Sequence, residues 1–234
     1  MPADRTPLGP RALVLFSGGQ DSTTCLFWAL ARWEGVRAVA FDYGQRHAVE
    51  IEQARAIAED AGVPFEVVPL DGALGGSALT DGGETDAPHP LAPDLPASFV
   101  PGRNALFLTL AASRAYLTET RDLVTGVCQT DYSGYPDCRL DFIHAQERAL
   151  SLALDAPLRI HTPLMHLTKA ETWKLAADLG TVRGMDVLET VRARSHTDYH
   201  GDRTPNEWGA GRLDNPASVL RAKGWEEAKA KGWV

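Results

Sequence analysis

Cysteine is scarce and hydrophobic runs are short in this chain of 234 residues. The three cysteines, Cys25, Cys128 and Cys138, are odd in number and widely spaced, which argues against a disulfide framework. The longest apolar runs, such as Ala12–Phe16, fall far short of the ~20 residues that cross a bilayer. Residues 1–10 also lack the apolar segment of a secretory signal. We therefore expect a cytoplasmic protein with no membrane partner.

Basic charge is not in excess either. Lys and Arg together number 23 and Asp and Glu 31, which gives a formal net charge of −8 and argues against a large nucleic-acid surface. The apolar fraction of 44% is ordinary for globular proteins. A chain of this length can remove about 70% of its unfolded surface from water. These values predict one sizeable core, or one domain with an appendage, and argue against a wholly disordered chain.

Short apolar runs alternate with helical patterns in the first third of the chain. Strands are expected at Ala12–Phe16, Val36–Asp42 and Phe65–Pro69, with helices between them at Thr23–Trp33 and Ala48–Ala61. This β-α-β-α-β order predicts a parallel sheet with helices on both faces. The same alternation continues with a helix near Asn104–Leu117, a strand at Leu123–Val127, a helix at Leu140–Leu154, a strand near Leu158–Ile160, and a helix that a T-x-x-E capping box opens at Thr168 and that ends at Gly180.

Two segments depart from this pattern. Asp71–Ser98 is rich in Gly, Pro, Ala and Asp and has no period, which is typical of a lid, a partner-binding loop or a disordered segment. After Arg192 the chain is polar with little periodicity. We interpret residues 191–234 as a small appendage that packs on a main domain of residues 1–190.

The strongest motif is S-G-G-Q-D-S at residues 17–22, between the first expected strand and the first expected helix. Its two glycines let the backbone approach an anion closely, and a helix N-terminus adds N–H donors and a positive dipole end. Asp21 would repel a bare phosphate, so it suits a residue that holds Mg²⁺ or orients the loop. The alternative is an ordinary glycine-rich turn with Ser22 as N-cap, which the complete hexapeptide in this context disfavours.

This hexapeptide resembles the PP-loop of the N-type ATP pyrophosphatases, which cleave ATP between the α- and β-phosphates and form an adenylated intermediate. The Walker motif G-x-x-x-x-G-K-[ST] is absent, so kinase-type transfer of the γ-phosphate is not expected. The resemblance implies an α/β fold of the PP-loop (adenine nucleotide alpha hydrolase-like) type, with ATP and Mg²⁺ as cofactors. It also implies that ATP is bound by Ser17, Gly18, Gly19, Gln20, Asp21 and Ser22.

Further segments narrow the family. They are F-D-Y-G-Q-R-H at 41–47, F-V-P-G-R-N at 99–104, G-V-C-Q-T-D-Y-S-G-Y-P-D-C-R at 126–139, T-P-L at 162–164 and L-T-K-A-E-T at 167–172. In order and spacing they resemble the QueC family of queuosine biosynthesis, the 7-cyano-7-deazaguanine (preQ0) synthases, from about residue 13 to residue 225. Most of these segments lie at or just after the end of an expected strand, where ligands bind in open parallel sheets.

The resemblance and the residue chemistry together define a candidate site. Asp21, Arg103 and Lys169 are the expected catalytic residues, and Tyr43 and Asn104 join Arg103 in binding ATP. For any one of these residues taken singly, as for Arg46 or Tyr135, the alternative is an ordinary solvated polar group. A deazapurine needs hydrogen-bond acceptors and a ring to stack on. The residues expected to supply them are Gln129, Asp131, Tyr132, Ser133, Tyr135, Asp137 and Arg139, while Cys128 and Cys138 are interpreted as packing residues rather than reactive thiols.

The resemblance also implies a reaction with two activations, catalysed by an AMP- and pyrophosphate-forming ligase. The carboxylate of 7-carboxy-7-deazaguanine attacks the α-phosphorus of ATP, and ammonia then displaces AMP to give the amide. A second ATP adenylates the amide oxygen, and loss of AMP leaves the nitrile. The protein supplies positioning and charge stabilisation. The resemblance further suggests a homodimer that takes small-molecule substrates and no nucleic acid.

The family carries four zinc cysteines in its C-terminal part, and this chain departs from that pattern. The corresponding positions hold Asp198, Arg212, Asn215 and Ser218. Arg212 has no acceptor for a metal, so no tetrahedral zinc site is expected. A cluster of His196, Asp198 and His200 is a less favoured metal alternative. We expect instead an Asp198–Arg212 ion pair, with Asn215 and Ser218 bonded to backbone in the turn around Pro216.

Two classes of function remain open, and a third is weaker. The chain makes preQ0 without zinc, or it is a QueC-like homologue that joins a deazaguanine acid to another amine or protein, or only binds the base. A tRNA-thiolating PP-loop enzyme would need a sulfur-carrying cysteine and a basic surface, and neither is evident. The intact substrate segments favour preQ0 synthesis, although fold alone does not determine function.

Overall fold

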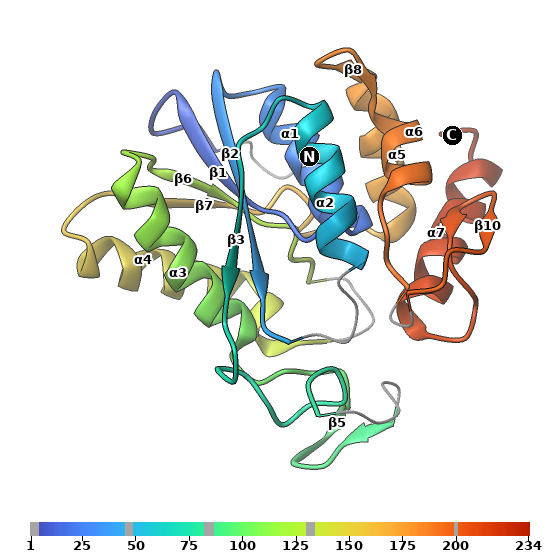
Figure 1. The fold of residues 1–234 in the computed structure, drawn as a ribbon, viewed down its shortest axis with the longest axis horizontal. Helices are drawn as coiled ribbons and strands as arrows, with labels where there is room; N and C mark the ends of the chain where they lie inside the picture. Colours follow the sequence, from blue (N-terminus) through green and yellow to red (C-terminus); the bar gives the residue numbers. More distant parts are fainter. Residues whose placement is uncertain (1–4, 45–48, 82–86, 130–133, 199–200) are drawn as a thin grey trace.

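The computed structural model describes residues 5–44, 49–81, 87–129, 134–198 and 201–234. A sheet of five parallel strands forms its centre, in the order β3-β2-β1-β6-β7 (Figure 1). Because β1 pairs with β2 on one side and with β6 on the other, the strand order reverses beside β1. Ligands of open α/β sheets bind at such a reversal, at the carboxyl ends of the strands. The strands are β1 (Arg11–Leu15), β2 (Gly35–Asp42), β3 (Phe65–Pro69), β6 (Asp122–Val124) and β7 (Arg159–His161).

The two faces of the sheet bury two separate cores. Alternate residues of a strand point to opposite faces, so Ala12, Val14 and Phe16 enter one core and Leu13 the other. Figure 1 shows α3 and α4 together on one side of the sheet. The predicted parallel sheet with helices on both faces is confirmed. The first core is covered by α1 (Gln20–Leu30), α2 (Val49–Asp60), α5 (Lys169–Leu179), α6 (Val187–Arg194) and α7 (Pro216–Ala230), and the second by α3 (Arg103–Leu117) and α4 (Leu140–Ala153).

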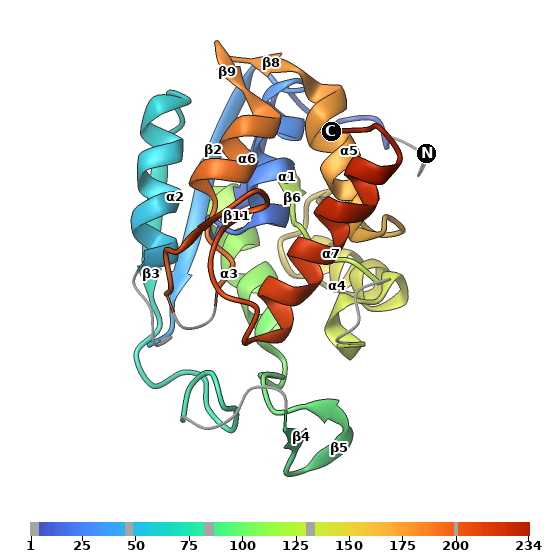
Figure 2. The same ribbon diagram turned by 90° about the vertical axis from the view of Figure 1, so that its right-hand side faces the viewer.

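Several elements were not expected from the sequence. The aperiodic segment 71–98 contains an antiparallel pair, β4 (Pro88–His89) and β5 (Ala92–Pro96), which projects away from the main sheet in Figures 1 and 2. The C-terminal part, expected to have little periodicity, carries the long helix α7. The remaining short elements are the 3₁₀ turn η1 (Pro136–Cys138), the pair β8 (Thr181–Val182) and β9 (Met185–Asp186), and the pair β10 (Pro205–Asn206) and β11 (Gly209–Ala210).

The C-terminal segment is packed on the main domain through α5. Trp173 on α5 and Trp225 on α7 meet edge to face with their ring centroids 5.0 Å apart, and Trp173 Nε1 donates to Arg221 O at 3.3 Å. The proposed boundary after residue 190 falls inside α6, which packs against α1, α2 and α5, so the division into domain and appendage stays a prediction. Among the described residues, no helix combines the length and apolar character needed to span a membrane.

Polar contacts hold the N-terminal segment against the far edge of the sheet. Arg5 forms a two-pronged ion pair with Glu147 on α4, whose carboxylate also accepts the N–H of Ile160 at 2.7 Å. Buried Asp122 accepts the backbone N–H of Leu8 and a hydrogen bond from His161 at 2.7 Å. These bonds are remote from the carboxyl ends of β1 and β6, so we assign them a structural role.

Candidate active site

The S-G-G-Q-D-S loop connects β1 to α1 and forms an open helix N-terminus. Gly19 is the N-cap of α1 and its side of the helix carries no side-chain cap in the described structure, so first-turn N–H groups beyond that of Gln20 can meet an anion. Ser22 lies in the first turn, where its hydroxyl contacts Ser17 Oγ at 3.1 Å and Gly19 O at 3.2 Å. The alternative with Ser22 as N-cap is therefore wrong.

Two glycines allow other segments to pack directly on this loop. Gly18 has φ +88, and a Cβ there would lie 2.5 Å from the carbonyl oxygen of Glu50 on α2. Gly126 follows β6, and a Cβ there would lie 3.2 Å from the backbone and side chain of Asp21. Both conformation and space require glycine at position 18. The loop is consequently enclosed by α2 on one side and by the segment after β6 on the other.

An ion pair joins the loop to the start of α5. Lys169 Nζ lies 2.5 Å from Asp21 Oδ2, and both side chains are largely buried. The predicted capping box at Thr168 and Glu171 is confirmed and directs Lys169 from the first turn of α5 toward the loop. The other carboxylate oxygen, Asp21 Oδ1, is buried without a hydrogen-bond partner in the described structure. An unpartnered buried carboxylate oxygen beside an anion-binding loop suits a divalent cation that also contacts phosphate.

The opposite wall begins at the N-terminus of α3. Arg103 Nη1 donates to the Tyr43 hydroxyl at 3.4 Å, so these two expected ATP residues meet. Asp137 accepts the Asn104 N–H at 3.0 Å and its side-chain amide at 3.3 Å. Asp137 therefore engages both carboxylate oxygens at the first turn of α3, and its role as an acceptor for the substrate base stays a prediction.

Tyr135 connects this wall to the projecting segment. Its hydroxyl lies 2.8 Å from Ser98 Oγ, and its ring packs against Phe99 at 5.5 Å between centroids. Burial raises the pKa of Tyr135 above its usual value, against the opposing effects of the Ser98 hydrogen bond and the Arg103 charge. Tyr135 is thus a neutral, planar group at neutral pH, suited to contact a heterocycle.

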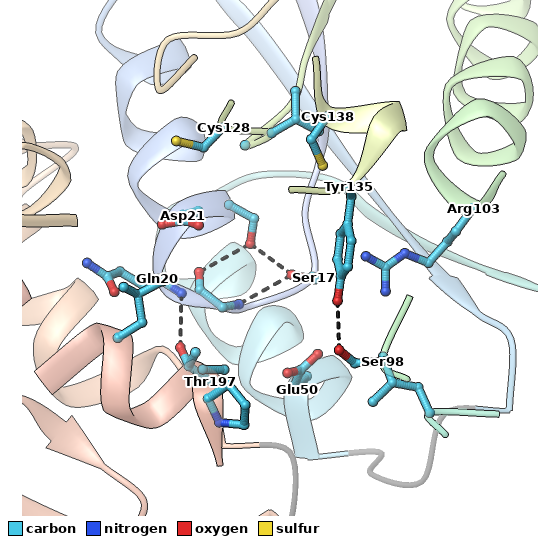
Figure 3. Close-up of a pocket in the computed structure, with 18 of the residues that line it drawn as sticks. Ser17, Gln20, Asp21, Glu50, Ser98, Arg103, Cys128, Tyr135, Cys138 and Thr197 are labelled. Atoms are coloured by element: carbon cyan, nitrogen blue, oxygen red, sulfur yellow. Dashed lines mark hydrogen bonds between the residues drawn. The ribbon is translucent and has the colours of Figure 1, made fainter. Parts of the chain in front are cut away.

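A cavity of about 1120 Å³ lies between the loop and this wall. Figure 3 shows Tyr135 and Arg103 on the side facing the loop residues Ser17 and Asp21. The predicted residues that line the cavity are Ser17, Gly19, Gln20, Asp21, Ser22, Tyr43, Arg103, Asn104, Tyr135 and Lys169. Gly18, Gln129, Asp137 and Arg139 lie outside its lining, whereas Arg46, Asp131, Tyr132, Ser133 and His200 fall outside the described residues.

Sequence reasoning missed several residues of this cavity. Glu50 enters it from the first turn of α2, and burial raises the pKa of its carboxyl to about 7 despite the opposing charge of Arg103. Thr197 enters from the segment after α6, together with His196, which the sequence had suggested only as a metal ligand. Burial lowers the pKa of His196, so its imidazole is neutral at pH 7. The available signal for Glu50 was its place three residues after the F-D-Y-G-Q-R-H segment at 41–47, and nothing in the sequence pointed to Thr197.

The C-terminal segment supports the phosphate loop through a buried arginine. Arg221 on α7 is fully buried and donates to Thr197 Oγ1 at 2.8 Å and to the carbonyl of Val191, at the end of α6, at 2.9 Å. Burial lowers the pKa of Arg221 to about 10, so it keeps its charge at pH 7. Thr197 Oγ1 in turn accepts the N–H of Gln20 at 3.5 Å, and the N–H of His196 bonds Gly18 O at 3.0 Å. Through these bonds the segment after α6 holds the phosphate loop in place.

The four positions at which the resemblance places zinc cysteines, Asp198, Arg212, Asn215 and Ser218, meet at one carboxylate. Asp198 Oδ2 accepts the Arg212 N–H at 2.9 Å, the Asn215 side-chain amide at 2.9 Å and the Ser218 hydroxyl at 3.0 Å. Asn215 caps α7 by accepting the Ser218 N–H, which confirms the expected backbone bond of Asn215, whereas the Ser218 hydroxyl bonds to the side chains of Asp198 and Asn215. The expected Asp198–Arg212 ion pair is wrong, because the Arg212 side chain turns outward to Asp202 at 2.8 Å. Only its backbone reaches Asp198.

The described contacts among the members of this buried cluster are hydrogen bonds. Asp198, Asn215 and Ser218 are each at most 3% exposed. Within the described part of the chain, no group of three His, Cys, Asp or Glu side chains could hold a metal ion. The Asp198 carboxylate, which accepts three donors through one oxygen, thus joins the positions at which the resemblance would place zinc cysteines.

A parallel sheet with this loop at its strand-order reversal, facing a cavity, defines an α/β protein of the PP-loop class. The family model "Queuosine biosynthesis protein QueC" matches residues 11–229. The chain is 49% identical over 224 residues to the 7-cyano-7-deazaguanine synthase of Wolinella succinogenes, covering 94% of each chain. It is 51% identical over 225 residues to that of Chromobacterium violaceum, covering 93% of this chain and 90% of the other. The chain belongs to the QueC family.

A solved structure with a similar outline is the NMN synthetase of Francisella tularensis. It aligns with 79% of this chain and 65% of its own at a TM-score of 0.48 and 15% identity.

Proposed function

We propose that this protein converts 7-carboxy-7-deazaguanine and ammonia to 7-cyano-7-deazaguanine, with ATP cleaved to AMP and pyrophosphate. The observation that carries the proposal is the single cavity lined both by the phosphate loop and by Arg103 and Tyr135. Such a cavity can hold a nucleotide and a second planar substrate in contact. Family membership and the relatives named 7-cyano-7-deazaguanine synthase support the choice of substrate.

The loop side of the cavity suits the phosphates of ATP. The N–H groups at the start of α1 and the hydroxyls of Ser17 and Ser22 are the donors that such an anion needs. Asp21 Oδ1 would hold Mg²⁺ together with the phosphates. When bound, the ion would neutralise charge on the oxygens of the leaving pyrophosphate. Lys169, held beside Asp21, would stabilise the charge that develops at the α-phosphorus.

The first activation is attack of the substrate carboxylate on the α-phosphorus, with pyrophosphate as the leaving group. Two anions must approach one another in this step, so positive charge on both sides of the cavity lowers the barrier. Lys169 supplies it at the loop and Arg103 at the opposite wall. Ammonia then attacks the acyl carbon and AMP leaves. The second activation repeats the adenylation on the amide oxygen, and loss of AMP leaves the nitrile.

The base would lie toward Tyr135, whose half-buried ring and hydroxyl offer a stacking face and a polar contact. Gln129, Asp131, Tyr132, Ser133, Asp137 and Arg139 remain proposed contributors to base recognition. Contacts from Ser98 and Phe99 connect this region to the projecting β4–β5 segment. That segment is accordingly our candidate for a cover over the base.

Incubation of the protein with 7-carboxy-7-deazaguanine, ATP, Mg²⁺ and ammonium, followed by mass spectrometry, tests the proposal. The expected products are the nitrile, AMP and pyrophosphate. Formation of ADP without AMP contradicts the assignment. Adenylation without nitrile, followed by capture by an added amine or protein, would instead favour a conjugating homologue. We further propose that the protein acts in the cytoplasm as a homodimer without a nucleic-acid partner, supported by the family resemblance and the acidic net charge.

A further inference from the structure

Glu50 is a carboxylate of the cavity that the reaction described above does not use. It lies in the first turn of α2, whose backbone packs directly on Gly18 of the phosphate loop. Figure 3 shows its carboxylate pointing into the pocket, toward the space between Ser17 and the Ser98–Tyr135 pair. Glu50 therefore lies where the nucleotide side of the cavity meets the base side, which is where the reacting acyl carbon must be held.

The surroundings of Glu50 leave its carboxylate available. Within the described structure no hydrogen bond or ion pair engages it, whereas Asp21 is paired with Lys169 and Asp137 with Asn104. Burial raises its pKa to about 7, and Arg103 is the described cation whose charge opposes that shift. A carboxylate with these properties is half ionised near neutral pH and accepts a proton readily.

The reaction contains one step that needs such a group. At pH 7 ammonia is almost entirely ammonium, which has no lone pair with which to attack the acyl adenylate. A half-buried carboxylate favours a small cation through charge, and the loss of water around the pair assists transfer of the proton. Asp21 is less suited to this step, since it is already paired with a cation and lies at the loop.

We infer that Glu50 binds ammonium beside the acyl adenylate and removes its proton, acting as the general base of the amidation step. One N–H bond breaks and its proton passes to the Glu50 carboxylate. The nitrogen lone pair then forms the C–N bond, and the C–O bond to AMP breaks with its electron pair leaving on AMP. A second nitrogen proton is released to solvent, which yields the neutral amide. This inference rests on the proposed function.

The test separates adenylation from amidation in Glu50→Gln, which is similar in size but cannot take up the proton. Acid-dependent exchange of pyrophosphate into ATP measures adenylation and should change by no more than about 2- to 3-fold. The kcat/KM for ammonium should fall about 100-fold at pH 7, in line with the loss of a general base. Hydroxylamine is largely unprotonated at this pH and needs no such base, so formation of the hydroxamate should continue at the parental rate.

Matched variants make the result specific. Glu59→Gln, on an exposed position of the same helix, should match the parent in all three assays. Glu50→Asp keeps a carboxylate and should retain more ammonium activity than Glu50→Gln, which also guards against loss of folding in the amide variant. An equal fall with hydroxylamine and ammonium, or a similar fall in pyrophosphate exchange, overturns the inference by assigning Glu50 to the acid or to ATP. Unchanged ammonium kinetics overturn it as well. A parent protein without acid-dependent exchange contradicts the proposed function itself, and the inference falls with it.

Discussion

Replacing Asp198 by Ala removes the acceptor on which the C-terminal cluster converges. Three donors to Oδ2, the Arg212 N–H, the Asn215 amide and the Ser218 hydroxyl, lose a partner that lies at 2.9, 2.9 and 3.0 Å, and the Asp202 N–H loses a longer bond of 3.3 Å to Oδ1. A hydrogen bond to a charged group contributes about 1.5–3 kcal/mol. Asn215 and Ser218 still contact one another at 3.1 Å, so the three losses are not additive. We expect the free energy of unfolding to fall by about 3–5 kcal/mol.

Arg212→Ala is the matched control for this cluster. Its side chain is 65% exposed and pairs with Asp202, so removing it should lower the free energy of unfolding by about 1 kcal/mol or less. Its backbone N–H, which remains, keeps the bond to Asp198. The two variants therefore distinguish the observed cluster from a simple Asp198–Arg212 ion pair, in which both substitutions would cost the same.

Urea unfolding of the two variants and hydrogen exchange of residues 195–218 measure the effect. We expect Asp198→Ala to lower the urea midpoint markedly and to speed exchange in this segment, with Arg212→Ala close to the parent. A zinc chelator should leave the parent's midpoint unchanged, because the cluster contains no metal ligand set. An Asp198→Ala protein as stable as Arg212→Ala would refute the reasoning.

Three further substitutions test other parts of the account. Asp21→Asn should lower the adenylation rate about 100-fold or more, with the affinity for the carboxylated base changed far less in calorimetric titration; equal losses in both would contradict a role in metal and phosphate alignment. Arg221→Met should raise the KM for ATP and lower the Tm, because it frees Thr197 behind the phosphate loop; a lower Tm with unchanged KM would restrict Arg221 to packing. Burial raises the pKa of Glu147, but bonds from Arg5 and the Ile160 N–H outweigh burial and hold it below its usual 4.5. The ionised Glu147 carboxylate therefore stabilises the fold above pH 4.5, and this contribution is lost as the pH falls and the carboxylate takes up a proton. Glu147→Gln should lower the free energy of unfolding by about 1 kcal/mol at pH 7 and by progressively less below pH 4.5, as measured by urea titrations at a series of pH values.

The central sheet and the phosphate loop could be predicted because their signals are local. Buried strands such as Ala12–Phe16 appear as continuous apolar runs, and two glycines before a helix have a direct conformational meaning. The capping box at Thr168 is similarly complete within four residues. These features were enough to predict the succession of strands along the chain and the edge of the sheet at which ligands would bind.

Helix α7 was missed because its sequence carries a signal against helix that only packing explains. Gly224 lies in its middle, where glycine normally weakens a helix. A Cβ at this position would lie 2.6 Å from the Cβ of Lys169, so glycine lets α7 approach α5 closely. A contact between residues so far apart in the sequence cannot be recognised from the local pattern of apolar residues.

The contacts that charged side chains make in the folded protein could also not be predicted from the neighbouring sequence. The contact of Asp137 with Asn104 across the start of α3 was not foreseen, and its role toward the base stays a prediction. Glu50 is an acidic residue in the first turn of a helix, and the helix dipole alone is enough to explain a negative charge at that position. Only the assembled cavity shows that one of these carboxylates is engaged and the other is available.

The central claim is that one site adenylates first the acid and then the amide. This claim can be tested with 7-carboxy-7-deazaguanine that carries ¹⁸O in both carboxylate oxygens, by mass spectrometry of the AMP released in the presence of ATP, Mg²⁺ and ammonium. Each activation transfers one substrate oxygen to phosphorus, so the account predicts two AMP for each nitrile, both bearing one ¹⁸O. Unlabelled AMP, or nitrile formed with a single labelled AMP, would contradict it.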